Sequence, residues 1–240
     1  MLNMKKIILY CLPYAGGSSY IYQQWRGILD DFIEVIPLEY SGRGTRFGDS
    51  LIKSAEEHVD DLFCIVKSRL EEPFAFFGHS MGSLLTFELI RTIHQRTGRS
   101  PVHGFFSAGY PPNRKPPFPY SSLPDDDFVS KIQLLGGTPI ELFQQKDLLK
   151  LFLPILRADF QVIDEYVYQP ELGVLPCDIT IFSGEHDPFT RHICISEWED
   201  FTNGSCSFME FPEGHFFIRS YEKEIVDTIR RTLESYKAHS

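Results

Sequence analysis

Short apolar, β-rich runs alternate along this chain with longer segments of helical periodicity. The runs predicted as strands are residues 7–12, 32–37, 74–77, 102–107, 179–183 and 205–211. Helical patterns lie between them, at residues 20–29, 55–70, 83–97, 191–201 and 222–236. Such alternation is typical of a parallel sheet covered by helices on both faces. We therefore predict an α/β fold with a mostly parallel central sheet, in a single domain over residues 1–240.

One long segment, residues 110–170, interrupts this alternation because it contains no convincing central strand. It opens with five prolines within residues 111–119 and continues with helical patterns at 124–135, 138–150 and 151–167. A strandless segment of this length is too long for a simple connection between two sheet strands. We predict an inserted helical cap, or lid. The alternative is a set of extra packing helices with no role in binding.

The overall composition is that of an ordinary globular chain, with 240 residues, 42% hydrophobic positions and 23% charged positions. The formal net charge of −10, without any basic block, argues against a nucleic-acid partner. The five cysteines are an odd number and form no Cys-x-x-Cys pair, so they indicate reduced thiols rather than a disulfide framework or a zinc site.

The first apolar run has some features of a targeting signal. Lys5 and Lys6 precede residues 7–12, which superficially resembles a short secretory leader. The run is at the short end for such a leader, and the Pro-Tyr-Ala-Gly-Gly segment that follows it is needed for the site described below. A core strand is the better interpretation, and no other run approaches the length of a membrane span. We expect a cytoplasmic monomer with no membrane association.

The most informative motif is Gly78-His-Ser-Met-Gly82, which lies between a predicted strand and a predicted helix. Gly-x-Ser-x-Gly in this setting is typical of a nucleophile elbow, a sharp turn that presents the serine hydroxyl. The glycines are required because a Cβ at either position would collide with neighbouring backbone. An ordinary glycine-bounded turn would show the same letters, but the flanking strand and helix favour the elbow. Ser80 is therefore the candidate nucleophile.

A serine nucleophile needs a base and an acid that orients the base, and in this architecture they follow in the order Ser, Asp or Glu, His. Asp187 is the better acid, because it follows a strand and a turn glycine, and the next residue is proline. Glu185 is the reserve, whereas Asp178 lies at the wrong end of its strand. His215 is the better base, since it follows the last strand and a glycine and precedes the final helix.

Three further histidines lie close to these motifs in the sequence, and none of them indicates a metal site. His186 and His192 lie near Asp187 in sequence, but their spacing matches no zinc template and a third ligand is not evident. His79 occupies the variable position of the elbow and fits a packing or pocket residue. We expect neither a metal nor a cofactor.

The loop after the first strand, residues 12–18, can supply part of an oxyanion hole. Such a hole needs two preorganised donors, one N–H after the nucleophile and one from an early loop. We assign these to Met81 and Ala15. A phosphate-binding interpretation of the Gly16-Gly17 region is disfavoured, because the loop lacks the lysine and glycine spacing of a P-loop.

Several motifs, taken in order, resemble those of the type II thioesterases, α/β-hydrolases that accompany nonribosomal peptide and polyketide synthetases. They are Leu12-Pro-Tyr-Ala-Gly-Gly-Ser18, Ser41-Gly-Arg-Gly-Thr-Arg46, Gly78-His-Ser-Met-Gly82, Leu123-Pro-Asp-Asp126, Leu135-Gly-Gly-Thr-Pro139, Gly184-Glu-His-Asp187 and Gly214-His215. The resemblance covers nearly the whole chain. One departure is Ser41, where the family often has proline, and it affects only the expected shape of that loop.

The resemblance implies hydrolysis of acyl thioesters from the phosphopantetheine arm of carrier proteins, which clears misprimed or stalled chains. It also implies Ser80 as nucleophile, Asp187 as orienting acid, His215 as base, and Ala15 and Met81 as oxyanion donors. The expected partners are acyl and peptidyl carrier domains. Three arginines near the predicted rim are candidates to dock them, namely Arg43, Arg46 and Arg114.

Apolar residues of the predicted cap are candidates for the wall of an acyl and pantetheine channel. They are Phe143, Leu148, Leu151, Phe152, Leu153 and Ile155. A helix face buried against the body would show the same pattern. Two other functions stay open: a carboxylesterase or lipase with the same triad, and a hydrolase-fold binding module without chemistry, against which the intact Ser, Asp and His set argues.

Overall fold

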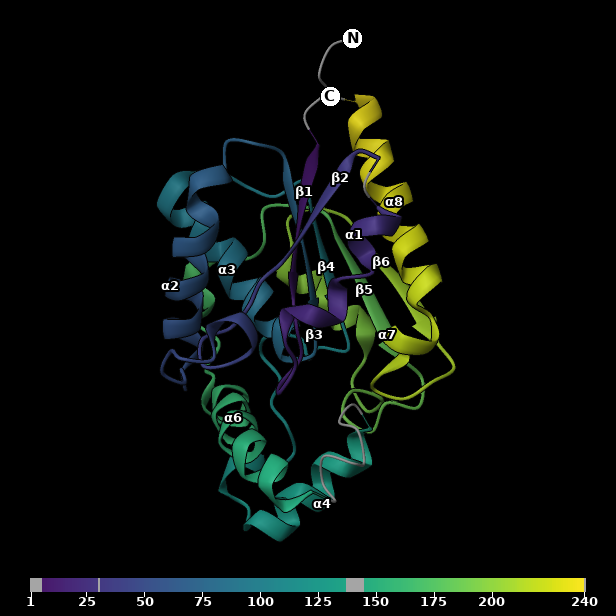
Figure 1. Cartoon of the computed structure of the whole chain (residues 1–240). Coiled ribbons are helices and arrows are strands. Elements are labelled where there is room, and N and C mark those ends of the chain that lie inside the picture. Colours follow the sequence, from purple (N-terminus) through teal and green to yellow (C-terminus); the bar gives the residue numbers. More distant parts are fainter. Residues whose placement is uncertain (1–5, 30, 137–144, 240) are drawn as a thin grey trace.

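One parallel sheet forms the centre of the protein, in a computed structural model that describes residues 6–29, 31–136 and 145–239 (Figure 1). Its six strands are β1 (Ile7–Leu12), β2 (Ile33–Pro37), β3 (Phe74–His79), β4 (His103–Ser107), β5 (Ile179–Gly184) and β6 (Cys206–Phe211). They lie in the order β2-β1-β3-β4-β5-β6, and every ladder is parallel. The predicted strands and the predicted parallel sheet are confirmed.

The helices surround this sheet and extend beyond one of its ends (Figure 1). They are α1 (Trp25–Ile28), α2 (Ala55–Val66), α3 (Met81–Thr97), α4 (Asp125–Leu135), α6 (Lys146–Glu165), α7 (Phe217–Ser220) and α8 (Glu222–His239). Short 3-10 segments also occur, among them η1 (Ser19–Tyr22), η3 (Lys67–Arg69), η4 (Tyr120–Ser122) and η6 (Ile195–Phe201). No helix in the described ranges is both long and apolar enough to span a lipid bilayer.

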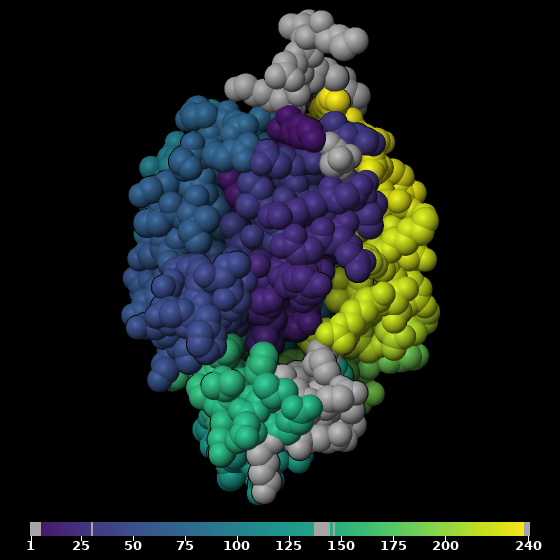
Figure 2. Space-filling view, viewed as in Figure 1, coloured from purple at the N-terminus to yellow at the C-terminus, as the bar shows by residue number. Residues whose placement is uncertain are grey.

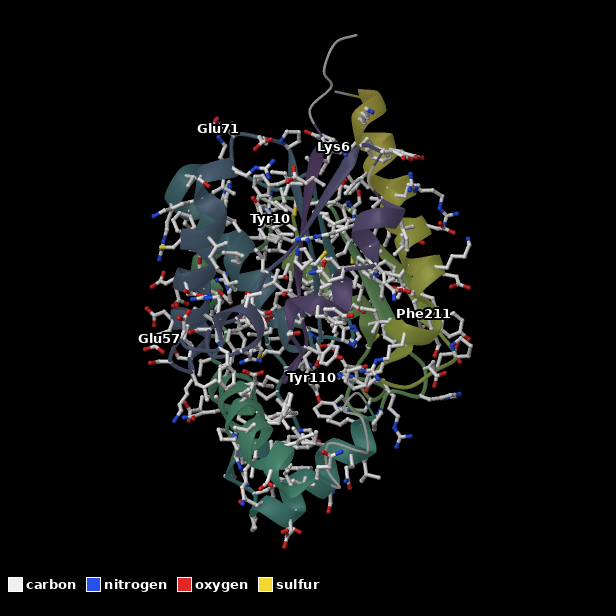
Figure 3. All side chains as sticks on the ribbon, viewed as in Figure 1. Lys6, Tyr10, Glu57, Glu71, Tyr110 and Phe211 are labelled. Carbon is white, nitrogen blue, oxygen red and sulfur yellow. The ribbon has the colours of Figure 1, made fainter. Side chains whose placement is uncertain are left out.

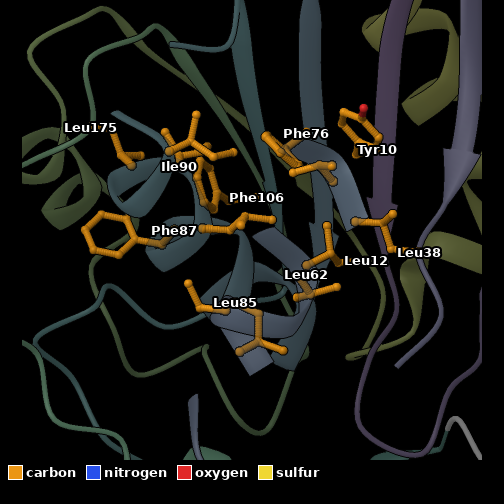
Figure 4. Close-up of a cluster of buried hydrophobic side chains, with 14 of the residues drawn as sticks. Tyr10, Leu12, Leu38, Leu62, Phe76, Leu85, Phe87, Ile90, Phe106 and Leu175 are labelled. Atoms are coloured by element: carbon orange, nitrogen blue, oxygen red, sulfur yellow. The ribbon is translucent and has the colours of Figure 1, made fainter. Parts of the chain in front are cut away.

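The two faces of the sheet have separate cores, because side chains of a strand point alternately to opposite faces. On one face, Tyr10, Leu12 and Phe76 belong to a buried cluster with side chains of α2 and α3 (Figure 4). On the other face, Leu9 and Phe77 pack with side chains of α1 and α8. All residues of β1 are buried, which explains why the strand reads as an uninterrupted apolar run.

The segment 20–29, predicted as one helix, consists instead of η1 and α1. Two buried aromatic side chains anchor it to the body: the Tyr22 hydroxyl donates to the Leu12 carbonyl at 2.9 Å, and the Trp25 indole N–H donates to Glu222 at 2.8 Å. These tertiary bonds, which no local pattern encodes, fix the path of the segment. Similarly, the pattern at 191–201 yields a 3-10 segment that begins only at residue 195.

Helices α4 and α6, with η4, lie beyond the carboxyl ends of the strands, and we call them the cap helices (Figures 1 and 2). They have their own small apolar cluster, which includes Phe128, Ile132, Leu156 and Phe160. No strand occurs in the described part of residues 110–170, as predicted. The helix predicted over 138–150 lies mainly outside the described residues.

The strand order defines where a site can form. The chain leaves β1 toward β2 at one edge, whereas β3 to β6 follow on the other side of β1. In such sheets the loops at the carboxyl ends diverge at the reversal point and leave a crevice there. Leu12 at the end of β1 pairs with Gly78 near the end of β3, so the loop after β1 and the Ser80 turn begin side by side.

Candidate active site

Ser80 occupies a strained turn between β3 and α3. Its φ of 56° and ψ of −115° lie in a region that residues other than glycine rarely adopt. A Cβ at Gly78 would lie 2.1 Å from the Gly82 carbonyl oxygen, and one at Gly82 would lie 2.3 Å from the Leu12 carbonyl oxygen. The glycines therefore allow the turn to pack directly on the end of β1. This is the geometry expected of the predicted elbow.

His215 joins Ser80 to Asp187. Its Nε2 lies 2.9 Å from Ser80 Oγ, and its Nδ1 lies 2.8 Å from Asp187 Oδ2. The three side chains come from three different loops, each at the carboxyl end of its strand: β3, β5 and β6. Asp187 is fully buried and His215 nearly so. The structure thus brings together the serine, acid and base candidates in one hydrogen-bonded chain.

Asp187 is held in its ionised form. Burial alone would raise its pKa, but the interactions with His215, the Phe189 N–H and the Thr190 hydroxyl together keep the pKa below its ordinary value. The hydrogen bonds to Oδ1 and Oδ2 measure 2.8 Å from Phe189 N and 2.9 Å from Thr190 Oγ1. A carboxylate can only accept, so His215 Nδ1 carries the proton and Nε2 is free to accept from Ser80.

The other candidate acids and histidines lie outside the hydrogen-bonded chain of Ser80, His215 and Asp187. Glu185 is exposed, and Asp178 accepts the backbone N–H of Ser205 at 2.7 Å. His186 and His192 are exposed, and the described residues contain no cluster of three groups able to hold a metal ion. His79 is buried beside His215, with ring centroids 5.6 Å apart. Burial lowers the pKa of His79 well below its ordinary value, so its neutral ring adds no charge next to the base.

The two oxyanion candidates flank Ser80. Met81 begins α3, where the first backbone N–H groups have no helical acceptor. Ala15 lies in the loop after β1, which folds into a tight turn with Gly17 N–H donating to the Tyr14 carbonyl at 2.8 Å. No hydrogen bond from the Ala15 or Met81 N–H occurs within the described part of the chain. Both groups are therefore available to a developing oxyanion.

Two cavities meet at Ser80 and His215. The first runs along the start of α3 and beneath the Pro-rich segment. Its walls are mostly apolar and include Leu84, Phe87, Tyr110, Ile163, Phe189 and Trp198. Tyr110 lies at the junction between the body and the cap helices (Figure 3). The second cavity lies under the cap helices and is lined by Tyr14, Ala15, Ile132, Leu135, Phe160 and Phe216.

The sequence pattern selected the wrong cap residues for these walls. Leu148 and Leu151 are exposed, and Ile155 is buried outside both cavities. The face of α6 that reaches the site begins further along the helix, with Phe160 and Ile163. The reason is that successive apolar residues along a helix lie on different sides of it, so they do not all face the site. Phe143 lies outside the described residues, and Phe152 and Leu153 line neither cavity.

All three predicted docking arginines form ion pairs within the protein, and they differ in exposure. Arg43 is buried and forms an ion pair with Asp159 on α6, so it is not a rim residue. Arg46 binds Asp61 and Asp49. Arg114 is exposed beside the first cavity, where it pairs with Glu197 at 2.6 Å. No local sequence pattern indicates the contact of Arg43 with Asp159, because the two residues are 116 positions apart.

Comparison with known proteins identifies the family. The sequence profile described as Thioesterase domain matches residues 7–233. A relative from Brevibacillus parabrevis, named Linear gramicidin dehydrogenase LgrE, is 34% identical over 235 residues, which cover 96% of this chain and 89% of the relative.

Solved structures agree with this match. The crystal structure of ClbQ, from the colibactin NRPS/PKS pathway, is 36% identical with a TM-score of 0.91 and covers 98% of this chain and 100% of its own. The type II thioesterase BorB, from the borrelidin biosynthetic cluster, is 30% identical with a TM-score of 0.86 and covers 96% of this chain and 94% of its own. The predicted α/β-hydrolase fold is confirmed. With a profile that spans most of its length and relatives above 30% identity, this chain belongs to the thioesterase domain family.

Proposed function

We propose that the protein hydrolyses acyl thioesters from the phosphopantetheine arm of carrier proteins, as an editing or releasing enzyme of nonribosomal peptide or polyketide synthesis. The observation that carries the proposal is the Ser80, His215 and Asp187 chain at the meeting point of two cavities. Family membership selects the thioester as the bond that is cleaved. The relatives ClbQ and BorB come from biosynthetic pathways of this kind.

Acylation is the first half of the proposed reaction. Ser80 Oγ attacks the thioester carbonyl carbon while its proton passes to His215 Nε2, 2.9 Å away. The oxyanion that forms accepts hydrogen bonds from the backbone N–H groups of Ala15 and Met81. The C–S bond then breaks, and the thiol leaves with the proton from His215. Asp187, ionised and fixed by three side-chain hydrogen bonds, stabilises the imidazolium in between.

Hydrolysis of the acyl-enzyme reverses these roles. Water gives a proton to His215 Nε2 and attacks the acyl carbon, the ester bond to Ser80 breaks, and Oγ recovers its proton. The products are the free acid and the free enzyme. The Ser80, His215 and Asp187 chain is arranged for proton and acyl transfer.

The two cavities suit the two parts of the substrate. The first has mostly apolar walls, which suit an acyl group, whereas the second passes under the cap helices beside Tyr14 and Phe216. We assign the acyl group to the first cavity and the pantetheine arm to the second. We also propose that residues 110–170 act as a cap, which shields the acyl-enzyme while the carrier domain stays outside.

The proposal is tested by comparing a thioester and an oxygen ester of the same acid. We expect a higher kcat/KM for the N-acetylcysteamine thioester than for the matched ethyl ester, and a still higher value for the same acyl group on a carrier protein. A preference for the ethyl ester would instead support a carboxylesterase.

A further inference from the structure

A buried ion pair connects the cap to the body next to the active site. Arg43 belongs to the Gly42-Arg43-Gly44 loop after β2, and Asp159 lies in the middle of α6. Both guanidinium Nη atoms contact the carboxylate, with Arg43 Nη2 at 2.6 Å from Asp159 Oδ1 and Nη1 against Oδ2. The Asp159 side chain is fully buried, and that of Arg43 is 4% exposed. A forked pair that excludes water in this way has a fixed geometry.

Asp159 makes one further contact, with the loop that carries the proposed oxyanion donor Ala15. Its Oδ2 accepts the backbone N–H of Gly16 at 2.6 Å. Gly16 directly follows Ala15, the proposed oxyanion donor, and has a φ of +76°. A Cβ at Gly16 would lie 2.5 Å from Leu156 Cδ2, so α6 packs against this turn without a gap. The cap helix therefore holds the oxyanion loop by both contact and charge.

The surrounding residues fix the remainder of the same loop. The Tyr40 ring lies beneath the Arg43 guanidinium, 5.3 Å from its carbon, and the Tyr40 hydroxyl donates to the Pro13 carbonyl at 2.9 Å. Glu39 accepts the Ser19 N–H at 3.0 Å and the Ser19 hydroxyl at 2.8 Å. Between these anchors at residues 13 and 19, the bond from Gly16 N–H to Asp159 is the side-chain-to-backbone hydrogen bond nearest to Ala15, and it adds to the Gly17 to Tyr14 backbone bond within the turn.

We propose that Arg43 and Asp159 are positioning residues for the oxyanion hole. This inference rests on the proposed function only in taking Ala15 as a donor. Arg43 holds the Asp159 carboxylate in its orientation, and Asp159 fixes the peptide that carries the Gly16 N–H. That peptide shares the Ala15 α-carbon with the one that carries the Ala15 N–H, so its orientation sets where the donor points. Donors aimed in advance at the oxyanion lower the barrier without tighter binding of substrate.

The test removes the pair without leaving a buried charge. The double variant Arg43→Met/Asp159→Leu replaces two charges by apolar groups of similar volume, a change that proteins often tolerate. We expect kcat on an acyl-pantetheine thioester to fall by about 10² while KM stays within about twofold, since misplacing one oxyanion donor costs about that much. The affinity for an alkyl boronic acid, which forms a tetrahedral adduct on Ser80, should fall in parallel. A purely structural pair would lower the melting temperature without changing that affinity.

Two single variants complete the test. Asp159→Asn keeps the shape and an acceptor for Gly16 N–H but loses the charge, so we expect a loss of about tenfold in kcat and in boronate affinity. It also keeps the proposal testable if the double variant does not fold. Asp61→Asn is the matched control, because it breaks the half-buried pair with Arg46 and does not contact Gly16; we expect wild-type values.

The inference is overturned if folded Asp159→Asn or the double variant retains wild-type kcat and boronate affinity. It is also overturned if the losses appear in KM and melting temperature alone. Boronate binding and fluorophosphonate labelling of Ser80 do not depend on the natural substrate. A wild-type enzyme that binds boronate but cleaves no thioester would therefore contradict the proposed function and leave this inference to be decided by the variants.

Discussion

His215 Nε2 lies 2.9 Å from Ser80 Oγ, although the two residues are 135 positions apart. Their meeting depends on the parallel sheet, which brings the carboxyl ends of β3 and β6 to one edge. We expect a fluorophosphonate to modify Ser80 and to abolish hydrolysis. Ser80→Ala and His215→Ala should each lower kcat by about 10⁶, because members of a triad act as a unit. Intact mass and steady-state rates provide the measurement, and full activity in Ser80→Ala would contradict serine catalysis.

Asp187 and Glu185 give a second, internally controlled comparison. Asp187→Asn should lower kcat by about 10⁴, because the amide favours the wrong His215 tautomer. Glu185→Gln, two residues away on the same loop, should leave kcat unchanged, since Glu185 is exposed. Both variants should be shown to unfold at similar urea concentrations before rates are compared. The reverse pattern of losses would make Glu185 the orienting acid.

His103 should weaken the folded state in mild acid. Burial lowers its pKa from 6.5 to about 4, and its Nε2 lies 2.9 Å from Thr180 Oγ1. Between these two pH values the unfolded chain binds a proton at this residue that the folded chain does not bind. The free energy of unfolding should therefore decrease as the pH falls through the interval, and the His103 contribution should level off below about pH 4. Urea titrations at several pH values measure this slope.

The matched variant is His103→Gln, which keeps a polar group beside Thr180 and removes the titration. Its stability should depend less steeply on pH than that of the wild type between pH 6.5 and 4. His58, whose pKa burial also lowers to about 4, is unchanged in both proteins and supplies a common background. Identical slopes would show that His103 does not bind its proton differently in the two states.

Encounter with an acidic carrier should not depend on long-range attraction. The chain has a net charge of −10, and of the three arginines expected at the rim only Arg114 is exposed there. Added salt should screen the net repulsion more than it weakens short-range contacts. The value of kcat/KM on an acyl-carrier substrate should stay flat or rise from low to moderate salt. A steep fall would indicate a strong basic docking surface.

Local sequence patterns were sufficient to predict the framework of the fold and the residues of the candidate site. The run at β1 and the glycines around Ser80 are encoded by close-range requirements, namely burial on two faces and lack of space for a Cβ. Asp187 and His215 could be predicted because each lies in the loop that follows a strand of the same parallel sheet. These features need no knowledge of the packing between distant segments.

Other features depend on contacts that the sequence does not reveal. The segment 20–29 is broken because Tyr22 and Trp25 bind distant groups. Arg43 resembled a surface residue, and only the position of α6 explains why it is buried. The cap residues that reach the cavities were misassigned, since an amphipathic pattern shows that a helix has a buried face but not which cavity that face meets.

Cleavage of an acyl thioester on a carrier protein can be followed directly through the mass of the carrier. A carrier whose phosphopantetheine bears a short acyl group is mixed with catalytic amounts of the enzyme, and intact mass is recorded over time. We expect loss of the acyl mass and appearance of the free acid with the wild-type enzyme, and no change of the carrier mass with Ser80→Ala. An acylated carrier that is stable to the wild-type enzyme, while the matched oxygen ester is cleaved, would contradict the proposed function.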